Sequence, residues 1–180
     1  MPPEPFDLDA QATTTLAPEA LAAMLPLLQG QHWNPHSAHR GGRIAKAALE
    51  AARTRIAVAL GREAEGLIFT SGATESNNLA LKGLLADTPG RLISFATEHS
   101  CVLEAARHLE RMGSEVTILP VTPDGLPDLA ALRVALQEPA ALVSCMAVNN
   151  EIGAIAPVAY IAAMAHATGA LFHCDAAQAF

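Results

Sequence analysis

The stretch Leu67-Ile68-Phe69-Thr70-Ser71-Gly72-Ala73-Thr74-Glu75-Ser76-Asn77-Asn78 decides the fold that the sequence predicts. Its first three residues are apolar and indicate a short buried strand, and a Thr-Ser-Gly turn leads into a helix. A turn of this kind leaves backbone N–H groups unpaired at the positive end of the helix dipole. Ser71 and Thr74 add hydroxyl groups there. The stretch therefore predicts an anion site, although an ordinary turn with a Ser cap has the same pattern.

Strand and helix patterns alternate from this stretch to the end of the chain. The expected strands span 67–70, 91–96, 115–121, 141–147 and 170–174, and the expected helices between them span 74–85, 99–112, 127–137 and 157–168. Two more helices are expected upstream, over 18–29 and 43–60, after an arm of residues 1–15 that lacks a regular pattern. Near-continuous apolar strands that alternate with helices predict an α/β fold, a mostly parallel open sheet with helices on both faces.

Composition excludes several classes of protein. The 180 residues carry a formal net charge of −7 without a basic stripe, which argues against nucleic-acid binding. The segment 152–174 lacks charged residues, but Gly153, Pro157 and Gly169 interrupt it, so we expect no membrane span. The three cysteines are widely spaced and form neither a disulfide framework nor a Cys-x-x-Cys motif, which favours a reducing cytoplasm.

Three histidines, His32, His36 and His39, lie within eight residues of one another. No carboxylate or thiol accompanies them, and the usual metal sites combine His with such ligands. We therefore expect a polar loop and no metal, and the sequence leaves the role of this cluster open.

Polar residues follow the expected strands, at the edge where open α/β sheets bind ligands. They are Ser71-Gly72-Ala73-Thr74, Thr97-Glu98-His99, Asn149-Asn150-Glu151, His173-Cys174-Asp175 and Gln178. The set lacks the Gly-x-Gly-x-x-Gly of dinucleotide sites, the Gly-Lys-Ser/Thr of P-loops and the Gly-x-Ser-x-Gly of serine hydrolases. An aromatic cation with a phosphate arm, such as pyridoxal phosphate, would use every part of it.

Each polar residue also has a purely structural interpretation. Asp175 could cap the turn that follows it, and His99 could serve the start of the next helix. Asn149 and Asn150 could simply form a turn. The joint arrangement is harder to explain in this way than any single member.

The chain resembles the cysteine desulfurases of the class-V aminotransferase family, which are fold type I pyridoxal-phosphate enzymes. Six motifs carry the resemblance in order from Leu8 onward. They are Leu8-Asp9-Ala10-Gln11-Ala12-Thr13-Thr14, Asn34-Pro35-His36-Ser37, Ile68 to Asn78, Glu98-His99, Val148-Asn149-Asn150-Glu151-Ile152-Gly153 and His173-Cys174-Asp175-Ala176-Ala177-Gln178.

The resemblance implies pyridoxal 5′-phosphate as cofactor, held by Ala73, Thr74, His99, Asn150, Asp175 and Gln178. Ala73 and Thr74 would bind its phosphate. His99 would stack on the pyridine ring and, as the catalytic residue, help to move protons. Asn150 and Gln178 would hydrogen-bond around the ring hydroxyl, and Asp175 would pair with the ring nitrogen.

The implied reaction converts L-cysteine to L-alanine and leaves the sulfur as a persulfide on an enzyme cysteine. The sulfur would pass to an acceptor or scaffold protein for iron–sulfur cluster or thio-cofactor assembly, and the resemblance implies a homodimer. Two alternatives stay open at this point. One is a selenocysteine lyase or another class-V enzyme, and the other is a non-catalytic truncated chain that acts only through partner binding.

The chain departs from the family in one large respect. The Schiff-base lysine of the family lies in a Ser-Gly-His-Lys segment beyond the Asp-x-x-Gln motif, and the persulfide cysteine lies later still. Lys46 and Lys82 are the only lysines of this sequence, and both fall in expected helices. Residues 16–180 thus correspond to the N-terminal part of the cofactor-binding large domain, without the lysine segment and the C-terminal small domain. Whether they are a fragment or a natural short form is open.

We expect no desulfurase turnover from these 180 residues alone. Contacts to phosphate, ring and hydroxyl, without a covalent link to a lysine, should retain the cofactor only weakly. Incubation with pyridoxal phosphate and L-cysteine should release sulfide no faster than the free cofactor does. Faster release would contradict this expectation.

Overall fold

The computed structural model describes residues 12–30, 33–87 and 89–179, which group into two compact units, Met1–Phe69 and Thr70–Phe180. Residues 1–11 of the expected arm lie outside the described residues, and residues 12–15 form neither helix nor strand.

The first unit contains the helices α1 (Pro18–Gly30) and α2 (Arg40–Leu60) and the short 3₁₀ turn η1 (Ala64–Gly66). Helix α2 begins three residues before the expected start at Arg43, because the His39 imidazole accepts a hydrogen bond from the Gly42 N–H and caps the helix. The sequence Gly41-Gly42 suggests a loop, but a Cβ on Gly41 would meet the Trp33 ring at 2.3 Å. These glycines serve close packing at the start of a helix.

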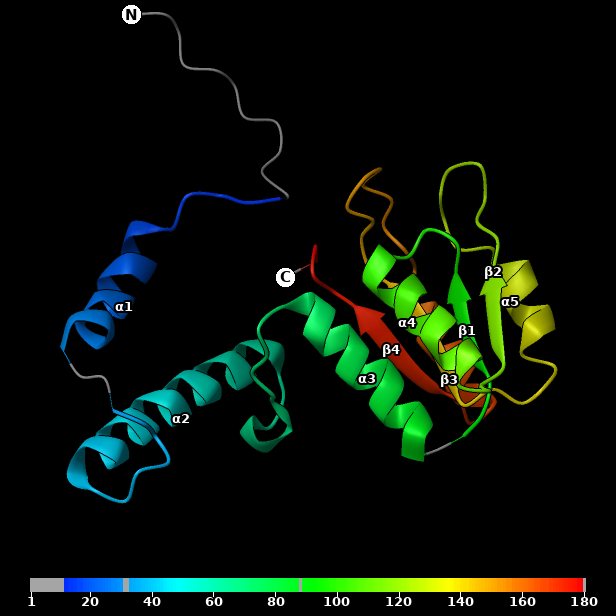
Figure 1. Cartoon of the computed structure of the whole chain (residues 1–180). Helices are drawn as coiled ribbons and strands as arrows, with labels where there is room; N and C mark the ends of the chain where they lie inside the picture. Colours follow the sequence, from blue (N-terminus) through cyan, green and yellow to red (C-terminus); the bar gives the residue numbers. More distant parts are fainter. Residues whose placement is uncertain (1–11, 31–32, 88, 180) are drawn as a thin grey trace, which may run out of the picture. The chain divides into compact units, whose positions relative to one another are not determined.

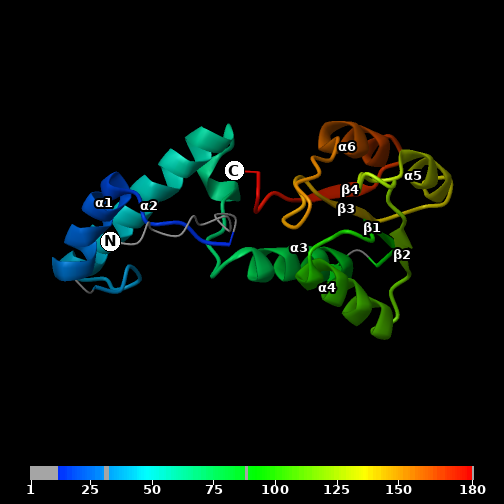
Figure 2. The same ribbon diagram turned by 90° about the horizontal axis from the view of Figure 1, so that it is seen from above.

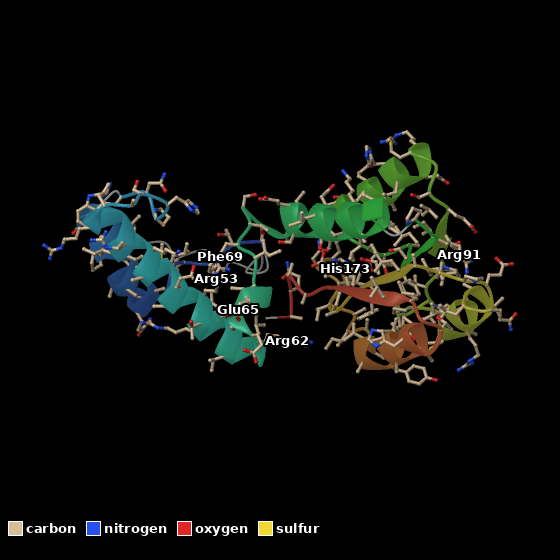
Figure 3. All side chains as sticks on the ribbon, turned by 90° about the horizontal axis from the view of Figure 1, so that it is seen from below. Arg53, Arg62, Glu65, Phe69, Arg91 and His173 are labelled. Atoms are coloured by element: carbon tan, nitrogen blue, oxygen red, sulfur yellow. The ribbon has the colours of Figure 1, made fainter. Side chains whose placement is uncertain are left out.

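The expected strand 67–70 is wrong. Its residues are not paired with any strand in the described part of the chain, and Ile68 is 70% exposed. Leu67 and Phe69 instead lie against helix α2, where the Arg53 guanidinium donates to the Leu67 carbonyl and lies 4.8 Å from the centre of the Phe69 ring (Figure 3). An apolar run forms a strand only where a neighbouring strand pairs with its backbone.

The second unit is a parallel sheet with four helices (Figure 1). In chain order its elements are α3 (Ala73–Asp87), β1 (Leu92–Phe95), α4 (Ser100–Arg111), β2 (Val116–Leu119), α5 (Leu129–Ala135), β3 (Leu142–Met146), α6 (Val158–Ala167) and β4 (Leu171–Asp175). The strand order is β2-β1-β3-β4, with every pairing parallel. The α/β fold with a parallel sheet is confirmed, as are four of the five expected strands.

Helices cover both faces of this sheet, α3 and α4 on one and α5 and α6 on the other (Figure 2). Side chains alternate between the two faces along each strand. Leu92 and Leu142 pack with α3 and α4, whereas their neighbours Ile93 and Val143 pack with α5 and α6. All four are fully buried, at 1% exposure or less, so the core consists of two layers separated by the sheet.

The uncharged segment 152–174 folds as helix α6 followed by strand β4. Within the described residues, no helix is long and apolar enough to cross a membrane.

The sheet order places the site. The chain passes from β1 outward to β2 on one side, and β3 and β4 lie on the other side of β1. Loops that leave β1 and β3 therefore diverge at the carboxyl edge, which is where open α/β sheets form a ligand crevice. Of the polar residues singled out in the sequence, 97–99, 149–151 and 173–178 lie at the ends of β1, β3 and β4 at this edge, whereas 71–74 lie at the start of α3.

Arg91 anchors the opposite end of the sheet, just before β1 (Figure 3). Its side chain is buried, and its Nη2 donates to the carbonyls of Ala135 at 2.5 Å and Glu138 at 2.8 Å. Nε donates to the Pro139 carbonyl at 3.3 Å. One guanidinium thus satisfies the carbonyl groups where α5 ends and its connection to β3 begins.

Changing Arg91 to Met should lower the free energy of unfolding by about 2–4 kcal/mol, because the carbonyls of Ala135 and Glu138 would lose a charged donor. Urea denaturation measures this. The matched control is Arg107→Met, because Arg107 pairs with Glu104 on the exposed surface of α4. That control should change stability by less than about 0.5 kcal/mol, and equal losses in the two variants would contradict the role given to Arg91.

Candidate functional site

The start of helix α3 is the expected anion site. Its first backbone N–H groups, those of Ala73 and Thr74, have no acceptor within the described residues. Ser71 differs from the expectation, because its hydroxyl donates to Glu75 Oε2 at 2.6 Å and its backbone N–H donates to the same oxygen at 2.7 Å. These two bonds hold the pKa of Glu75 below its ordinary value. Thr74 and the helix N–H groups, and not Ser71, are thus the available donors.

Thr74 and His99 line one hollow of about 460 Å³, which runs between α3 and α4. His99 precedes α4 as its N-cap residue, and its Nδ1 accepts a hydrogen bond from the Cys101 N–H at 3.2 Å. The interpretation that His99 serves the start of the next helix is therefore correct for its Nδ1. Nε2 has no partner within the described residues and is available to a ligand in the hollow.

Asp175, the last residue of β4, is buried at 7% exposure. Its Oδ2 accepts from Asn77 Nδ2 at 2.8 Å, and its Oδ1 accepts from the Ala177 N–H at 3.0 Å. Asp175 does cap the turn after the strand, as one interpretation of the sequence proposed. A carboxylate oxygen accepts more than one hydrogen bond, so the group still has capacity for a further donor.

Asn77 was not predicted as a site residue. It lies on α3, one turn before the fully buried Leu81, and is itself only 3% exposed. The signal in the sequence was its helical spacing from Leu81, which places an amide on the face toward the sheet.

The two asparagines after β3 have different surroundings. Asn149 builds the turn, since its Oδ1 accepts from the Glu151 and Ile152 N–H groups and its Nδ2 donates to the Thr97 carbonyl at 2.8 Å. That last bond ties the loop after β3 to the loop that carries His99. Asn150 is half-buried in the same turn. Its contact to a ring hydroxyl stays a prediction.

Gln178 lies in the turn after β4 with its side chain exposed, and it is engaged in an interaction with the rest of the chain. The structure thus brings Thr74 and His99 together around one hollow and links Asp175 to α3 through Asn77. Asn150 and Gln178 belong to the same edge of the sheet, and their proposed contacts with a ligand are untested.

Glu98 is a buried carboxyl group between β1 and β3. Its Oε1 accepts from the Met146 N–H at 2.6 Å, and its Oε2 has no hydrogen-bond partner in the described part of the chain. Burial raises the pKa of Glu98 to about 7, against the lowering effect of the Met146 bond and with a further rise from Asp175. Asp175 therefore has a neighbouring acid that is largely uncharged below neutral pH.

His173 lies beside Ser144 on the neighbouring strand, with its Nδ1 2.9 Å from the Ser144 hydroxyl (Figure 3). Burial lowers the pKa of His173, although Asp175 acts in the opposite direction. His173 is accordingly a neutral, hydrogen-bonded part of the sheet.

Two of the three clustered histidines, His36 and His39, take part in local hydrogen bonds of the first unit. His39 caps helix α2, and the His36 N–H donates to Asn34 Oδ1 at 2.8 Å. His32 lies outside the described residues. Among residues 12–30, 33–87 and 89–179, no three His, Cys, Asp or Glu side chains are grouped as metal ligands.

Comparison with known proteins identifies the family. The sequence profile of the class-V aminotransferases matches residues 7–180. The chain belongs to the class-V aminotransferase family. It is 48% identical over 180 residues to the cysteine desulfurase IscS of Rickettsia bellii, a match that covers 98% of this chain and 44% of that protein. The chain thus spans less than half the length of this relative.

Solved structures share the fold. The structure titled "SspA in complex with cysteine" superposes with a TM-score of 0.90 at 37% identity, over 96% of this chain and 50% of that one. DndA from Streptomyces lividans superposes with a TM-score of 0.83 at 40% identity, over 97% of this chain and 50% of the other. The recognition of a cysteine desulfurase resemblance in the six motifs is confirmed.

Glu98 should make stability depend on pH. Its pKa is raised from 4.5 to about 7, so the folded chain binds more protons than the unfolded chain between these pH values. Stability contributed by this group therefore falls as pH rises through that window, by roughly 3 kcal/mol in total. Glu98→Gln keeps an acceptor for Met146 but cannot ionise, so it should gain stability relative to the wild type by up to that amount above pH 7.

Urea denaturation of both proteins across this pH range measures the difference. Glu104→Gln on the exposed surface of α4 is the matched control, and its stability should follow the wild-type curve. A Glu98→Gln curve parallel to the wild type would contradict the assignment.

Proposed function

We propose that this chain supplies the N-terminal part of the cofactor-binding domain of a pyridoxal-phosphate-dependent cysteine desulfurase. The reaction converts L-cysteine to L-alanine and passes the sulfur to an enzyme cysteine as a persulfide. The observation that carries the proposal is the buried Asp175 carboxylate, held by Asn77 at the edge where α3 presents its N-terminus. The relatives named as cysteine desulfurases support the choice of substrate.

The residues fit the cofactor at both of its ends. The N–H groups of Ala73 and Thr74, at the positive end of the α3 dipole, would hold the phosphate. Asp175 would accept a hydrogen bond from the protonated ring nitrogen. When bound, pyridoxal phosphate supplies an electron sink. The sink is stronger when a carboxylate keeps the ring nitrogen protonated.

His99 would cover the ring and move a proton. It lines the same hollow as Thr74, and only its Nε2 is available to a ligand because Nδ1 accepts from the Cys101 N–H. Asn150 and Gln178 would hydrogen-bond around the ring hydroxyl from the turns after β3 and β4. Glu98 and Asn149 hold the loops that carry His99 and Asn150.

The wider setting is part of the proposal. The substrate would be L-cysteine, and one similar structure is titled as a complex with cysteine. A sulfur acceptor or scaffold protein would receive the sulfur for iron–sulfur or thio-cofactor assembly, and the enzyme would act as a homodimer in the cytoplasm. All three cysteines are free thiols, which is compatible with a reducing compartment.

Cofactor binding is tested by titrating the chain with pyridoxal phosphate and following the cofactor's absorbance. Asp175→Asn should weaken binding about tenfold or more, because the protonated ring nitrogen would lose a charged partner. Pyridoxal, which lacks the phosphate, should bind more weakly than pyridoxal phosphate. Asp124→Asn, on an exposed turn, is the matched control and should bind as the wild type does. Equal affinity of the Asp175→Asn and wild-type proteins would overturn the assignment.

The activity is tested separately, in a chimera in which this chain replaces the matched 44% of the Rickettsia bellii enzyme. The chimera should form L-alanine and sulfide from L-cysteine, and His99→Ala should reduce the rate at least a hundredfold if His99 moves a proton in the reaction. A chimera that binds the cofactor but leaves L-cysteine unchanged would refute the desulfurase and keep the cofactor site.

A further inference from the structure

A buried hydrogen-bond network connects the two groups proposed to face the cofactor ring. Asn77 Nδ2 lies 2.8 Å from Asp175 Oδ2 and 3.2 Å from Cys101 Sγ. Cys101 Sγ in turn lies 3.0 Å from His99 Nδ1. The series Asp175, Asn77, Cys101 and His99 thus joins strand β4 to the loop after β1 through side chains of α3 and α4.

The direction of each bond follows from its two ends. The Asn77 amide nitrogen only donates, so Asp175 and Cys101 Sγ both accept from it. At the other end the backbone N–H of Cys101 also donates, so His99 Nδ1 is the ring nitrogen without a hydrogen. The remaining contact then runs from the Cys101 S–H to His99 Nδ1. Each contact in the series therefore has one donor and one acceptor, and no two donors face each other.

This polarity selects one form of the His99 ring. With two donors directed at Nδ1, the hydrogen of the neutral imidazole lies on Nε2. The opposite tautomer would point its N–H at the backbone N–H of Cys101. Burial limits hydrogen bonding of these groups to water, since Asn77 is 3% exposed, Asp175 7% and Cys101 9%.

We propose that Asn77 and Cys101 are positioning residues, which together fix the His99 ring as the Nε2–H tautomer and orient the Asp175 carboxylate. Asn77 does so through its two amide hydrogens, and Cys101 through its thiol. The significance of this for catalysis rests on the proposed function, because the Nε2–H that His99 then presents is a donor, which can give a proton to a bound cofactor or substrate. The arrangement of the network itself is a property of the chain without cofactor.

The tautomer is measured on the cofactor-free chain labelled with ¹⁵N-histidine. Long-range ¹H–¹⁵N spectra distinguish a nitrogen that carries hydrogen from one that does not, and loss of a signal set in His99→Gln assigns His99 among the seven histidines. The wild type should show hydrogen on Nε2. In Cys101→Ala the Nδ1 signal should shift, because Nδ1 would accept one hydrogen bond fewer. Cys101→Ser keeps an O–H donor and should restore the wild-type position of the signal.

Asn77→Leu removes both amide donors and keeps the branched shape of the side chain, and the smaller Asn77→Ala serves the same purpose if the larger Leu disturbs the fold. Both should shift the His99 Nδ1 signal, because the thiol loses the donor that orients it. In the pyridoxal phosphate titration both should weaken binding about tenfold through Asp175. Gln137→Leu, the same type of change on an exposed turn, is the matched control and should alter neither readout.

The outcomes separate the two proposals. Hydrogen on Nδ1 in the wild type, or an unchanged Nδ1 signal in Cys101→Ala and both Asn77 variants, would overturn the network. If the wild type binds the cofactor and the Asn77 variants bind it equally well, Asn77 does not orient Asp175. If the wild type fails to bind the cofactor while the ¹⁵N spectra behave as expected, the proposed function fails and the network stands.

Discussion

The hydrogen bond from Asn77 to Asp175 is the contact on which the site depends. It joins helix α3 to strand β4 across 98 residues of sequence, and both groups are buried. Without it Asp175 would keep only its bond to the Ala177 N–H, and a buried carboxylate with few donors is costly. Because α3 also begins with the N–H groups of Ala73 and Thr74, which have no acceptor among the described residues, the bond fixes the carboxylate relative to the candidate anion site.

Two further bonds hold the loops at the carboxyl edge of the sheet. Glu98 accepts from the Met146 N–H, and Asn149 donates to the Thr97 carbonyl, so the loops after β1 and β3 are tied together in both directions. These bonds lie beyond the parallel pairing of β1 with β3, whose last paired residues are Ile93 and Val143. Asn149 makes the hydrogen bonds of the turn, and a ligand contact of its neighbour Asn150 stays a prediction.

The sequence predicted the sheet well and the site in part, for physical reasons. Apolar runs such as Leu142 to Met146 identify strands buried on both faces, and their ends identify the edge. The run at 67–70 has the same pattern but lacks a paired neighbour in the described residues, and periodicity does not report pairing. Helical spacing indicates only that Asn77 faces the sheet. The partners of Asn77 and Cys101 were missed because these contacts join separate elements.

The structural and functional interpretations of these residues turn out to be compatible, because each group has two polar atoms. His99 uses Nδ1 to cap α4, which leaves Nε2 for chemistry and at the same time fixes which nitrogen carries the hydrogen. Asp175 uses Oδ1 for the turn and Oδ2 for Asn77, and both oxygens keep a lone pair. The capping bond would thus orient each group toward the proposed cofactor. A residue that caps a helix or turn at the carboxyl edge of a parallel sheet is for this reason a better candidate for the site, since its second polar atom is held in place before any ligand binds.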